Sequence, residues 1–456
     1  GQITQIKNSI KTAVKIRPAI TDYIVCIPRD LASMTGRSDN TEDARWDKLV
    51  ADMEKLYPTV KITLWNNARL VEELQKPNCS GIYRFWFETS EISNETVKYA
   101  FDKARSSWLD TKYVPALNTF GKIEKTISSF LGYAEQRATL SDVFTRINTY
   151  CKQYTTAADA LLLVCSENDT ELKDLVASTS ERINSISKSC DVIQYWLENE
   201  ALSEETIDDN AFNIDFDTLA DQIYHAERAC RLHFHISEVT KVLRKLSKID
   251  CYELLQEVER CRSKRSIIFL GGPGTGKTHG VSAVTEKLLQ ENLHVPLLIR
   301  ARNVPSSHTW KDIISDYLGI SSEWNEDDLF QGLSSLAHRN IFTESSLKSP
   351  IVVTPKICVI IDGLDESAPH DRWVERIKET DAIVAKYPQI RFCFTSRSVP
   401  LPKPINYANA IRLGNGGDVP AYKLFDGYMK AYNISAENRG WLRTVLTTPL
   451  ALKLFC

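Results

Sequence analysis

The sequence predicts an α/β protein whose largest part is a parallel β-sheet covered by helices. Two observations favour this class. From residue 263 onward, short apolar runs rich in Ile, Val and Phe alternate with segments of helical spacing, and strands separated by helices pair in parallel. The first of these runs, IIFL at 267–270, leads into a glycine-rich turn that closes on GKT at 276–278. That turn indicates what the sheet binds.

The turn at 271–278 reads GGPGTGKT and matches G-x-x-x-x-G-K-[ST] between an apolar run and a helical pattern, which is the context of a phosphate-binding loop. Glycines allow backbone N–H groups to turn inward around phosphates. Lys277 would place its charge on the β- and γ-phosphates, and Thr278 would offer its hydroxyl to Mg²⁺. We predict a nucleoside triphosphate site with ATP and Mg²⁺ as cofactors, although a preference for another triphosphate stays open. The predicted loop residues are Gly271, Gly272, Pro273, Gly274, Thr275, Gly276, Lys277 and Thr278.

An acidic motif follows a later strand of the same segment. The apolar run KICVII at 356–361 leads directly into DGLDE at 362–366. Asp362 therefore emerges at the carboxyl edge of the predicted sheet, where it would hold Mg²⁺ together with Thr278. Glu366, and secondarily Asp365, would orient or deprotonate the attacking water. Surface charge is the simpler alternative for either acidic residue taken alone.

A candidate γ-phosphate contact ends the next strand. The run QIRFCF at 389–394 is closed by TSR at 395–397, so Arg397 also lies at the carboxyl edge. A guanidinium there would contact the γ-phosphate and report its presence. An arginine in an ordinary ion pair is the alternative.

The remaining elements of the third segment, 263–432, complete a doubly wound parallel sheet. We expect helices at 278–291, 310–318, 327–337, 372–386 and 420–432, and further strands at 295–299 and 410–413.

The first segment, 1–110, predicts a small α/β domain, because strand-like and helical patterns alternate there. Arg29 and Asp30 follow a predicted strand, where ligands of α/β proteins often bind, but a turn with a local ion pair is the favoured interpretation. Helices are expected at 6–14, 44–56 and 68–74, and strands at 22–27, 60–65 and 81–87.

The middle segment, 111–262, predicts a helical array. It has no proline between Pro115 and Pro273 and no glycine between Gly132 and Gly271, and these residues are the ones that break helices. The acidic stretch at 204–217 lacks the glycine and terminal glutamate of a calcium loop. His233 and His235 are interpreted as core or surface residues rather than metal ligands. Helical spacing recurs at 139–154, 172–186, 190–196, 216–225 and 236–246.

Composition sets limits on the class of protein. The chain has 456 residues and a net charge of −3, which argues against a globally basic nucleic-acid coat. Its 11 cysteines form no C-x-x-C, a pattern typical of reduced thiols in the cytoplasm. No apolar run approaches the roughly 20 residues that span a bilayer. We expect a cytoplasmic protein without membrane contact, and an internal piece of a longer one, because both ends fall inside helical patterns.

The phosphate loop, DGLDE and TSR together resemble the NACHT-type branch of the STAND signal-transduction ATPases, which are relatives of AAA+ proteins. The run TPLALKLFC at 448–456 resembles the helix of that family whose proline packs against adenine. The resemblance implies that Pro449 contacts the base. It also implies that 433–456 begins a helical and winged-helix region.

The N-terminal patterns DYIVCIPRD, ITLWNNARLVEEL and GIYRFWF resemble the distal half of a restriction-endonuclease-like effector domain, and KYVPALN at 112–118 the junction after it. The order of nuclease fold, helical linker and ATPase is similar to the bacterial antiviral STAND proteins called Avs. The resemblance implies that a C-terminal region senses a phage protein, either large terminase or portal. Sensing would drive assembly into a tetrameric homo-oligomer whose endonuclease cleaves DNA. The nuclease residues are expected upstream of Gly1, so none is predicted here.

Two other classes of ATPase stay open at this point. An AAA+-type mechanical ATPase that acts on DNA, like a clamp loader or replication initiator, would show fast, DNA-stimulated hydrolysis. A small-molecule P-loop kinase is disfavoured by the long helical array.

Overall fold

The computed structural model divides the chain into two compact units. One consists of Gly1–Ser90 with Trp324–Gly332, the other of Glu91–Glu323 with Leu333–Cys456. Among the described residues, no helix combines the length and apolar character that crossing a membrane requires. The structure describes residues 2–18, 20–31, 41–88, 91–109, 113–117, 121–199, 209–226, 232–262, 266–321, 323–340, 353–397, 410–413, 421–435 and 439–456.

The first unit contains a two-stranded parallel sheet. Strands β1 (Asp22–Cys26) and β2 (Lys61–Trp65) pair in register from Asp22 opposite Lys61 to Cys26 opposite Trp65. Helices α1 (Gln2–Ile16), α2 (Glu42–Leu56) and α3 (Asn67–Leu74) surround them. The helices and both strands agree with the sequence prediction. The shared core consists of Ile10, Val25, Leu49, Met53, Val60 and Ile62.

The aromatic segment predicted as a strand at 81–87 is instead helix α4 (Ser80–Phe87). Contacts within the first unit explain the difference. Gly81 packs closely on the backbone of Asp328, and its N–H donates to Gln331 Oε1 at 3.0 Å. The Arg84 guanidinium lies 4.7 Å from the ring centroid of Trp324. These tertiary contacts outweigh the β-propensity of the aromatic residues.

The two residues singled out after β1 are held locally. Arg29 pairs with Glu42 at 2.8 Å, and Asp30 accepts a hydrogen bond from the N–H of Ala68 at 3.0 Å. The favoured interpretation, a turn with an ion pair, is confirmed.

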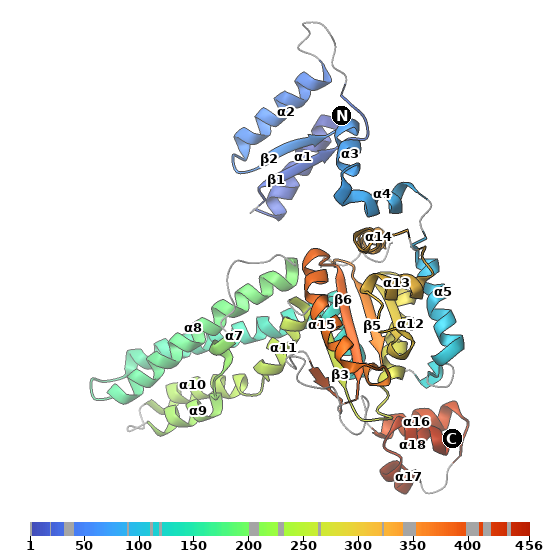
Figure 1. Cartoon of the computed structure of the whole chain (residues 1–456). Coiled ribbons are helices and arrows are strands. Elements are labelled where there is room, and N and C mark those ends of the chain that lie inside the picture. Colours follow the sequence, from blue (N-terminus) through green and yellow to red (C-terminus); the bar gives the residue numbers. More distant parts are fainter. Residues whose placement is uncertain are drawn as a thin grey trace. The chain divides into compact units, whose positions relative to one another are not determined.

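The second unit is built on a five-stranded parallel sheet of order β4-β5-β6-β3-β7 (Figure 1). This confirms the predicted α/β fold with a helical array. Strand β6 lies between β3 and β5, so the ends of three strands that carry candidate site residues stand side by side. The strands are β3 (Ser266–Leu270), β4 (Val295–Arg300), β5 (Ile357–Asp362), β6 (Ile390–Ser396) and β7 (Ala410–Arg412).

Helices cover both faces of this sheet. On one face, α6 (Lys122–Leu131) and α12 (Lys277–Glu291) share a core with Phe269 and Ile360. On the other face, Trp310 of α13 (Trp310–Leu318) lies 4.7 Å from Phe392, between ring centroids. Helix α15 (His370–Lys386) contributes Trp373 to the same cluster. Helix α14 (Glu326–Arg339) begins among the residues grouped with the first unit.

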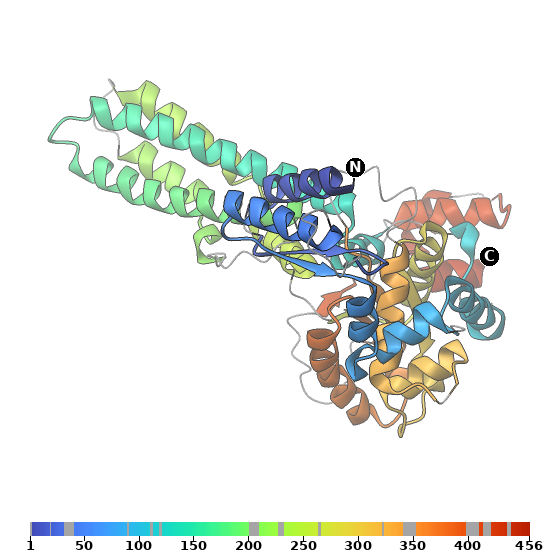
Figure 2. The ribbon, with the colours of Figure 1, turned by 90° about the horizontal axis from the view of Figure 1, so that it is seen from above.

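The predicted helical array forms in the second unit, with longer helices than the sequence spacing indicated. The separate patterns at 172–186 and 190–196 are one helix, α8 (Thr170–Asn199), which runs beside α7 (Ala134–Val164) (Figure 2). Part of the acidic stretch at 204–217 lies outside the described residues, and no group of three metal-ligating side chains occurs within them. The other helices are α9 (Phe216–His225), α10 (His233–Leu246) and α11 (Cys251–Arg262).

Three short helices follow the sheet. They are α16 (Ala421–Ala431), α17 (Arg439–Val445) and α18 (Pro449–Phe455). Phe425 and Leu452 are fully buried between them, together with Leu117 from the 3₁₀ turn Pro115–Leu117. The turn Pro115–Leu117, which precedes α6, therefore packs on this C-terminal cluster.

Candidate functional site

The phosphate loop at 271–278 joins β3 to the first turn of α12. Gly274 and Gly276 have φ angles of +73° and +85°, a left-handed conformation that glycine adopts without strain. The Lys277 Nζ donates to the carbonyl oxygens of Gly271 at 2.7 Å and of Gly272 at 2.9 Å. Burial lowers the pKa of Lys277, while Asp365 and Asp362 act in the opposite direction. The lysine is thus partly desolvated inside its own loop.

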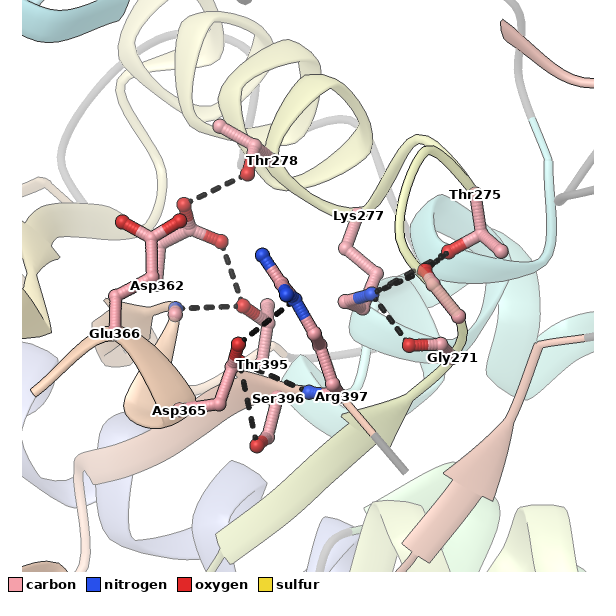
Figure 3. A network of polar contacts seen from close by, with 12 residues as sticks. Gly271, Thr275, Lys277, Thr278, Asp362, Asp365, Glu366, Thr395, Ser396 and Arg397 are labelled. Atoms are coloured by element: carbon pink, nitrogen blue, oxygen red, sulfur yellow. Dashed lines mark hydrogen bonds and ion pairs between the residues drawn. The ribbon is translucent and has the colours of Figure 1, made fainter. Parts of the chain in front are cut away.

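The predicted magnesium ligands lie together although 84 residues separate them in the chain. Asp362 is the last residue of β5 and is 3% exposed. Its Oδ2 accepts a hydrogen bond from the Thr278 hydroxyl at 2.8 Å. Figure 3 shows the hydrogen bonds that join Asp362 to Thr278 and to Thr395, beside the phosphate loop. A carboxylate and a hydroxyl at this spacing are oxygen donors of the kind that Mg²⁺ prefers.

Thr395 is a site residue that the sequence analysis quoted in TSR without giving it a role. Its side chain is fully buried at the end of β6. The hydroxyl donates to Asp362 Oδ1 at 2.6 Å and accepts from the N–H of Gly363 at 2.9 Å. It therefore fixes the carboxylate and the start of DGLDE in one arrangement. The sequence could have indicated a role for Thr395, because it lies two residues before Arg397 on β6, the strand between β3 and β5.

Asp365 and Arg397 form an ion pair at the mouth of the site. Arg397 Nε lies 3.0 Å from Asp365 Oδ2, and the backbone N–H of Arg397 donates to Asp365 Oδ1 at 2.9 Å. About half of the Arg397 side chain is exposed, whereas that of Asp365 is only 9% exposed. The arginine is therefore both ion-paired and accessible from the site.

Glu366 lies beside a residue that the sequence analysis did not name. Its Oε2 accepts from Arg300 Nη2 at 2.7 Å and from Nε at 3.2 Å. Arg300 is the last residue of β4 and stands opposite Asp362 in the sheet register. The signal was available, because Arg300 ends its strand at the same edge as Asp362.

The C-terminal helix α18 packs against the phosphate loop. Thr448 caps it by accepting the N–H of Ala451 at 3.2 Å. The Pro449 Cγ would lie 3.4 Å from a Cβ placed on Gly276, and Leu450 would clash with a Cβ placed on Gly274. At Gly274 only a glycine leaves room for this approach, whereas a Cβ on Gly276 would be in ordinary contact with the proline. The predicted base-contact residue, Pro449, is thus adjacent to the loop.

One cavity of about 360 Å³ brings these elements together. Its volume is within the range of small-ligand sites, and its lysines and arginine suit a polyphosphate. Gly271 and Gly272 take part through their carbonyls on Lys277 rather than through the cavity lining. The predicted site residues that line it are Pro273, Gly274, Thr275, Gly276, Lys277, Thr278, Asp362, Asp365, Glu366, Arg397 and Pro449; Thr395, Tyr428, Leu450 and Lys453 also line it.

A comparison with protein families places this region among known sequences. Residues 251–397 match the model of the N-terminal region of nephrocystin 3. The matched residues run from α11 to Arg397 and include the phosphate loop, Asp362 and Glu366. A search of curated proteins finds no match to the chain.

Proposed function

We propose that the second unit binds and hydrolyses ATP and acts as a nucleotide-controlled assembly switch. The observation that carries this proposal is the single cavity in which the phosphate loop, Asp362, Arg397 and Pro449 converge. A glycine-rich loop for phosphates, oxygen ligands for a cation and a nearby arginine are the parts that phosphoryl transfer requires.

Each residue has a role that its surroundings support. The loop N–H groups and Lys277 would hold the phosphates, and Thr278 with Asp362 would hold Mg²⁺. When bound, ATP and Mg²⁺ supply the phosphoanhydride bond and the charge that stabilises its cleavage. Glu366 would orient the attacking water, Arg397 would contact the γ-phosphate, and Pro449 would pack on the base.

The finer part of the proposal concerns the biological role. We propose an Avs-type STAND protein of antiphage defence, in which a phage terminase or portal protein triggers tetramerisation and a DNA endonuclease effector. The match to the nephrocystin 3 N-terminal model is compatible with a STAND-type NTPase. The packing of Leu117 with Phe425 and Leu452 supports coupling between the turn Pro115–Leu117 and the site, because Phe425 and Leu452 belong to α16 and α18, which lie beside the site.

The central test is Lys277→Ala. We expect the substitution to abolish ATP binding, measured by isothermal titration, because the lysine provides the buried charge of the loop. The melting temperature without nucleotide should stay near that of the wild type. Lys287→Ala is a matched control, since Lys287 is on the same helix but pairs with Glu124 at 2.7 Å, away from the cavity. Equal ATP affinity of Lys277→Ala and wild type would overturn the proposal.

Glu366→Gln tests the hydrolytic role. The amide keeps the size of the side chain but removes its basicity, so ATP should bind and kcat should fall by at least about 100-fold. Phosphate release measured with and without DNA separates the switch from the mechanical alternative. Fast hydrolysis that DNA stimulates would favour the AAA+-type motor.

A further inference from the structure

We infer that helix α14 supplies the N-terminal cap of helix α4, so that the aromatic segment Ser80–Phe87 is helical only while the first turns of α14 are folded. The capping bond joins residues that are 250 positions apart in the chain. This role of α14 is independent of nucleotide binding and goes beyond the proposed ATPase. It makes α4 a conditional helix, whose order another part of the chain controls.

Helix α4 lacks the features that stabilise a helix by itself. It has only 8 residues, whereas isolated helices shorter than about 12–15 residues are marginal in water. Its sequence, SGIYRFWF, consists mainly of glycine, isoleucine and aromatic residues, which form helices less readily than alanine or leucine. The side chain of its N-cap residue, Cys79, makes no capping bond. The local sequence therefore does not account for the helix.

The side chain of Gln331, in α14, binds the turn at which α4 begins. Its Oε1 accepts the N–H of Gly81 at 3.0 Å, and this N–H is one of the first in α4, which have no partner within the helix. Its Nε2 donates to the carbonyl oxygen of Asn78 at 2.8 Å. An N-cap side chain ordinarily accepts such an N–H. In α4 a glutamine from another helix takes that part.

Three further contacts hold α4 against the start of α14. The Ser80 hydroxyl donates to Oδ1 of Asp328, which is buried. A Cβ on Gly81 would lie 2.4 Å from the carbonyl oxygen of Asp328, so the glycine permits the close approach of the two backbones. The Arg84 guanidinium lies 4.7 Å from the ring centroid of the buried Trp324, within the range of a cation–π contact.

The first turn of α14 has a cap of its own. The Asn325 Oδ1 accepts the N–H of Asp328 at 2.8 Å, and Gln331 follows within the next turn. Loosening of this start would therefore remove the bonds that hold α4. The helix runs from Glu326 to Arg339, and its later residues are grouped with the second unit. The order of α4 thus depends on a helix whose residues belong to both units.

Release of α4 would uncover an aromatic segment. Phe85 is buried, whereas Tyr83, Trp86 and Phe87 are exposed even in the docked helix. Aromatic residues are more frequent in strands than in helices, so the released segment would not keep its helical form. The contact with α14 therefore keeps the segment folded and Phe85 covered.

The first test measures amide hydrogen exchange by mass spectrometry in the full chain. Gln331→Leu removes both bonds to the start of α4, and we expect the protection of residues 78–88 to fall at least about tenfold. Protection of α9 should not change, because its cap is local: Asp215 Oδ1 accepts the N–H of Thr218 at 3.0 Å. Gln222→Leu, the same substitution at an exposed position of α9, is the matched control.

Gly81→Ala distinguishes docking from intrinsic preference, because the two predict opposite results. Alanine forms helices more readily than glycine, so a helix that forms by its own preference would gain protection. Since the alanine Cβ would lie too close to the Asp328 backbone, we expect protection to fall at least about tenfold instead. Gly427→Ala in α16 is the control, because a Cβ there meets nothing within 4 Å. It should leave the protection of α16 unchanged or raise it.

Asn325→Ala tests whether the order of α4 follows that of α14. Loss of the cap should lower the protection of the first turn of α14 and of residues 78–88 together, whereas Asn325→Asp keeps a capping oxygen and should preserve both.

Three results would overturn the capping role of α14. They are equal protection of residues 78–88 in wild type and folded Gln331→Leu, increased protection in Gly81→Ala, and a loosened α14 in Asn325→Ala with α4 still protected. Should Gly81→Ala fail to fold, the comparison of Gln331→Leu with wild type decides. All proteins are measured without nucleotide, so the result is independent of whether the chain binds ATP.

Discussion

The carboxyl edge of the sheet and the helical array differ in the residues that hold them together. At the edge, polar and charged side chains meet within hydrogen-bonding distance, as in Asp362 with Thr278 and Arg300 with Glu366. The array is held by apolar side chains such as Phe144, Tyr154 and Ile183, all nearly or fully buried. Substitutions in the two regions should therefore change different properties of the protein. Changes in the array should cost stability, and changes at the edge should cost ligand binding or turnover.

The largest effect on stability is expected from Phe144→Ala. Phe144 is 1% exposed and makes an edge-to-face contact with Phe212, with ring centroids 6.4 Å apart. Its truncation should lower the free energy of unfolding by about 3–5 kcal/mol, measured by urea denaturation. Leu163→Ala is the control, because Leu163 is on the same helix but 86% exposed. Loss of ATP affinity in the folded Phe144→Ala protein would contradict the expectation that substitutions in the array reduce stability and leave ligand binding intact.

Thr395→Val tests a residue that has features of both regions, because Thr395 is buried and also positions Asp362. Valine keeps the shape but leaves Asp362 Oδ1 and the Gly363 N–H without the Thr395 hydroxyl. We expect the free energy of unfolding to fall by about 1–3 kcal/mol and Mg²⁺-dependent ATP affinity to fall as well. Thr395→Ser retains the hydroxyl and should preserve the affinity. A normal affinity in Thr395→Val would mean that Asp362 is positioned without this bond.

An effect that is confined to acidic pH is expected at His294, which lies before β4 and away from the site. Burial lowers the pKa of His294 to about 3, and its Nδ1 accepts the N–H of Lys356 at 3.1 Å. Below its ordinary pKa of about 6.5, the unfolded chain binds a proton that the folded chain does not. As the pH is lowered from about 6.5 toward about 3, the free energy of unfolding should therefore fall by about 1.4 kcal/mol per pH unit.

His294→Asn isolates this contribution, because asparagine offers an oxygen to the same N–H but does not titrate. Urea denaturation at pH 7, 6 and 5 should give a shallower pH dependence for the variant. Parallel curves would show that His294 binds its proton at the same pH in the folded and in the unfolded chain. His279, whose pKa burial also lowers, is present in both proteins and cancels from the difference.

Much of the candidate site could be predicted from the sequence, because residues that follow the strands of a parallel sheet lie at the same edge of that sheet. Asp362 and Arg397 each follow an apolar run, and parallel strands bring such residues to one edge. The glycine pattern required no tertiary information either. The helical array could be predicted because its segment lacks helix breakers. The sequence did not reveal that the patterns at 172–186 and 190–196 form a single helix, α8.

What the sequence did not reveal depends on contacts between distant residues. The segment Ser80–Phe87 has the composition of a strand, and only the contacts of Gly81 and Arg84 with residues of 324–332 explain the helix. Likewise, the end of β4 indicates that Arg300 lies at the same edge as Asp362, but not that it pairs with Glu366, 66 residues later. Thr395 shows the same limit, since the bond that defines its role spans 33 residues.

The contact of Pro449 and Leu450 with the glycines of the phosphate loop has a thermodynamic consequence. Because Leu450 occupies the space above Gly274, the position of α18 and the shape of the loop depend on each other. Coupling of this kind is reciprocal: whatever factor nucleotide applies to the docking of α18, docking applies to nucleotide affinity. If the site binds nucleotide as proposed, a protein that displaces the C-terminal helices would thereby change the affinity for nucleotide without contacting the phosphate loop.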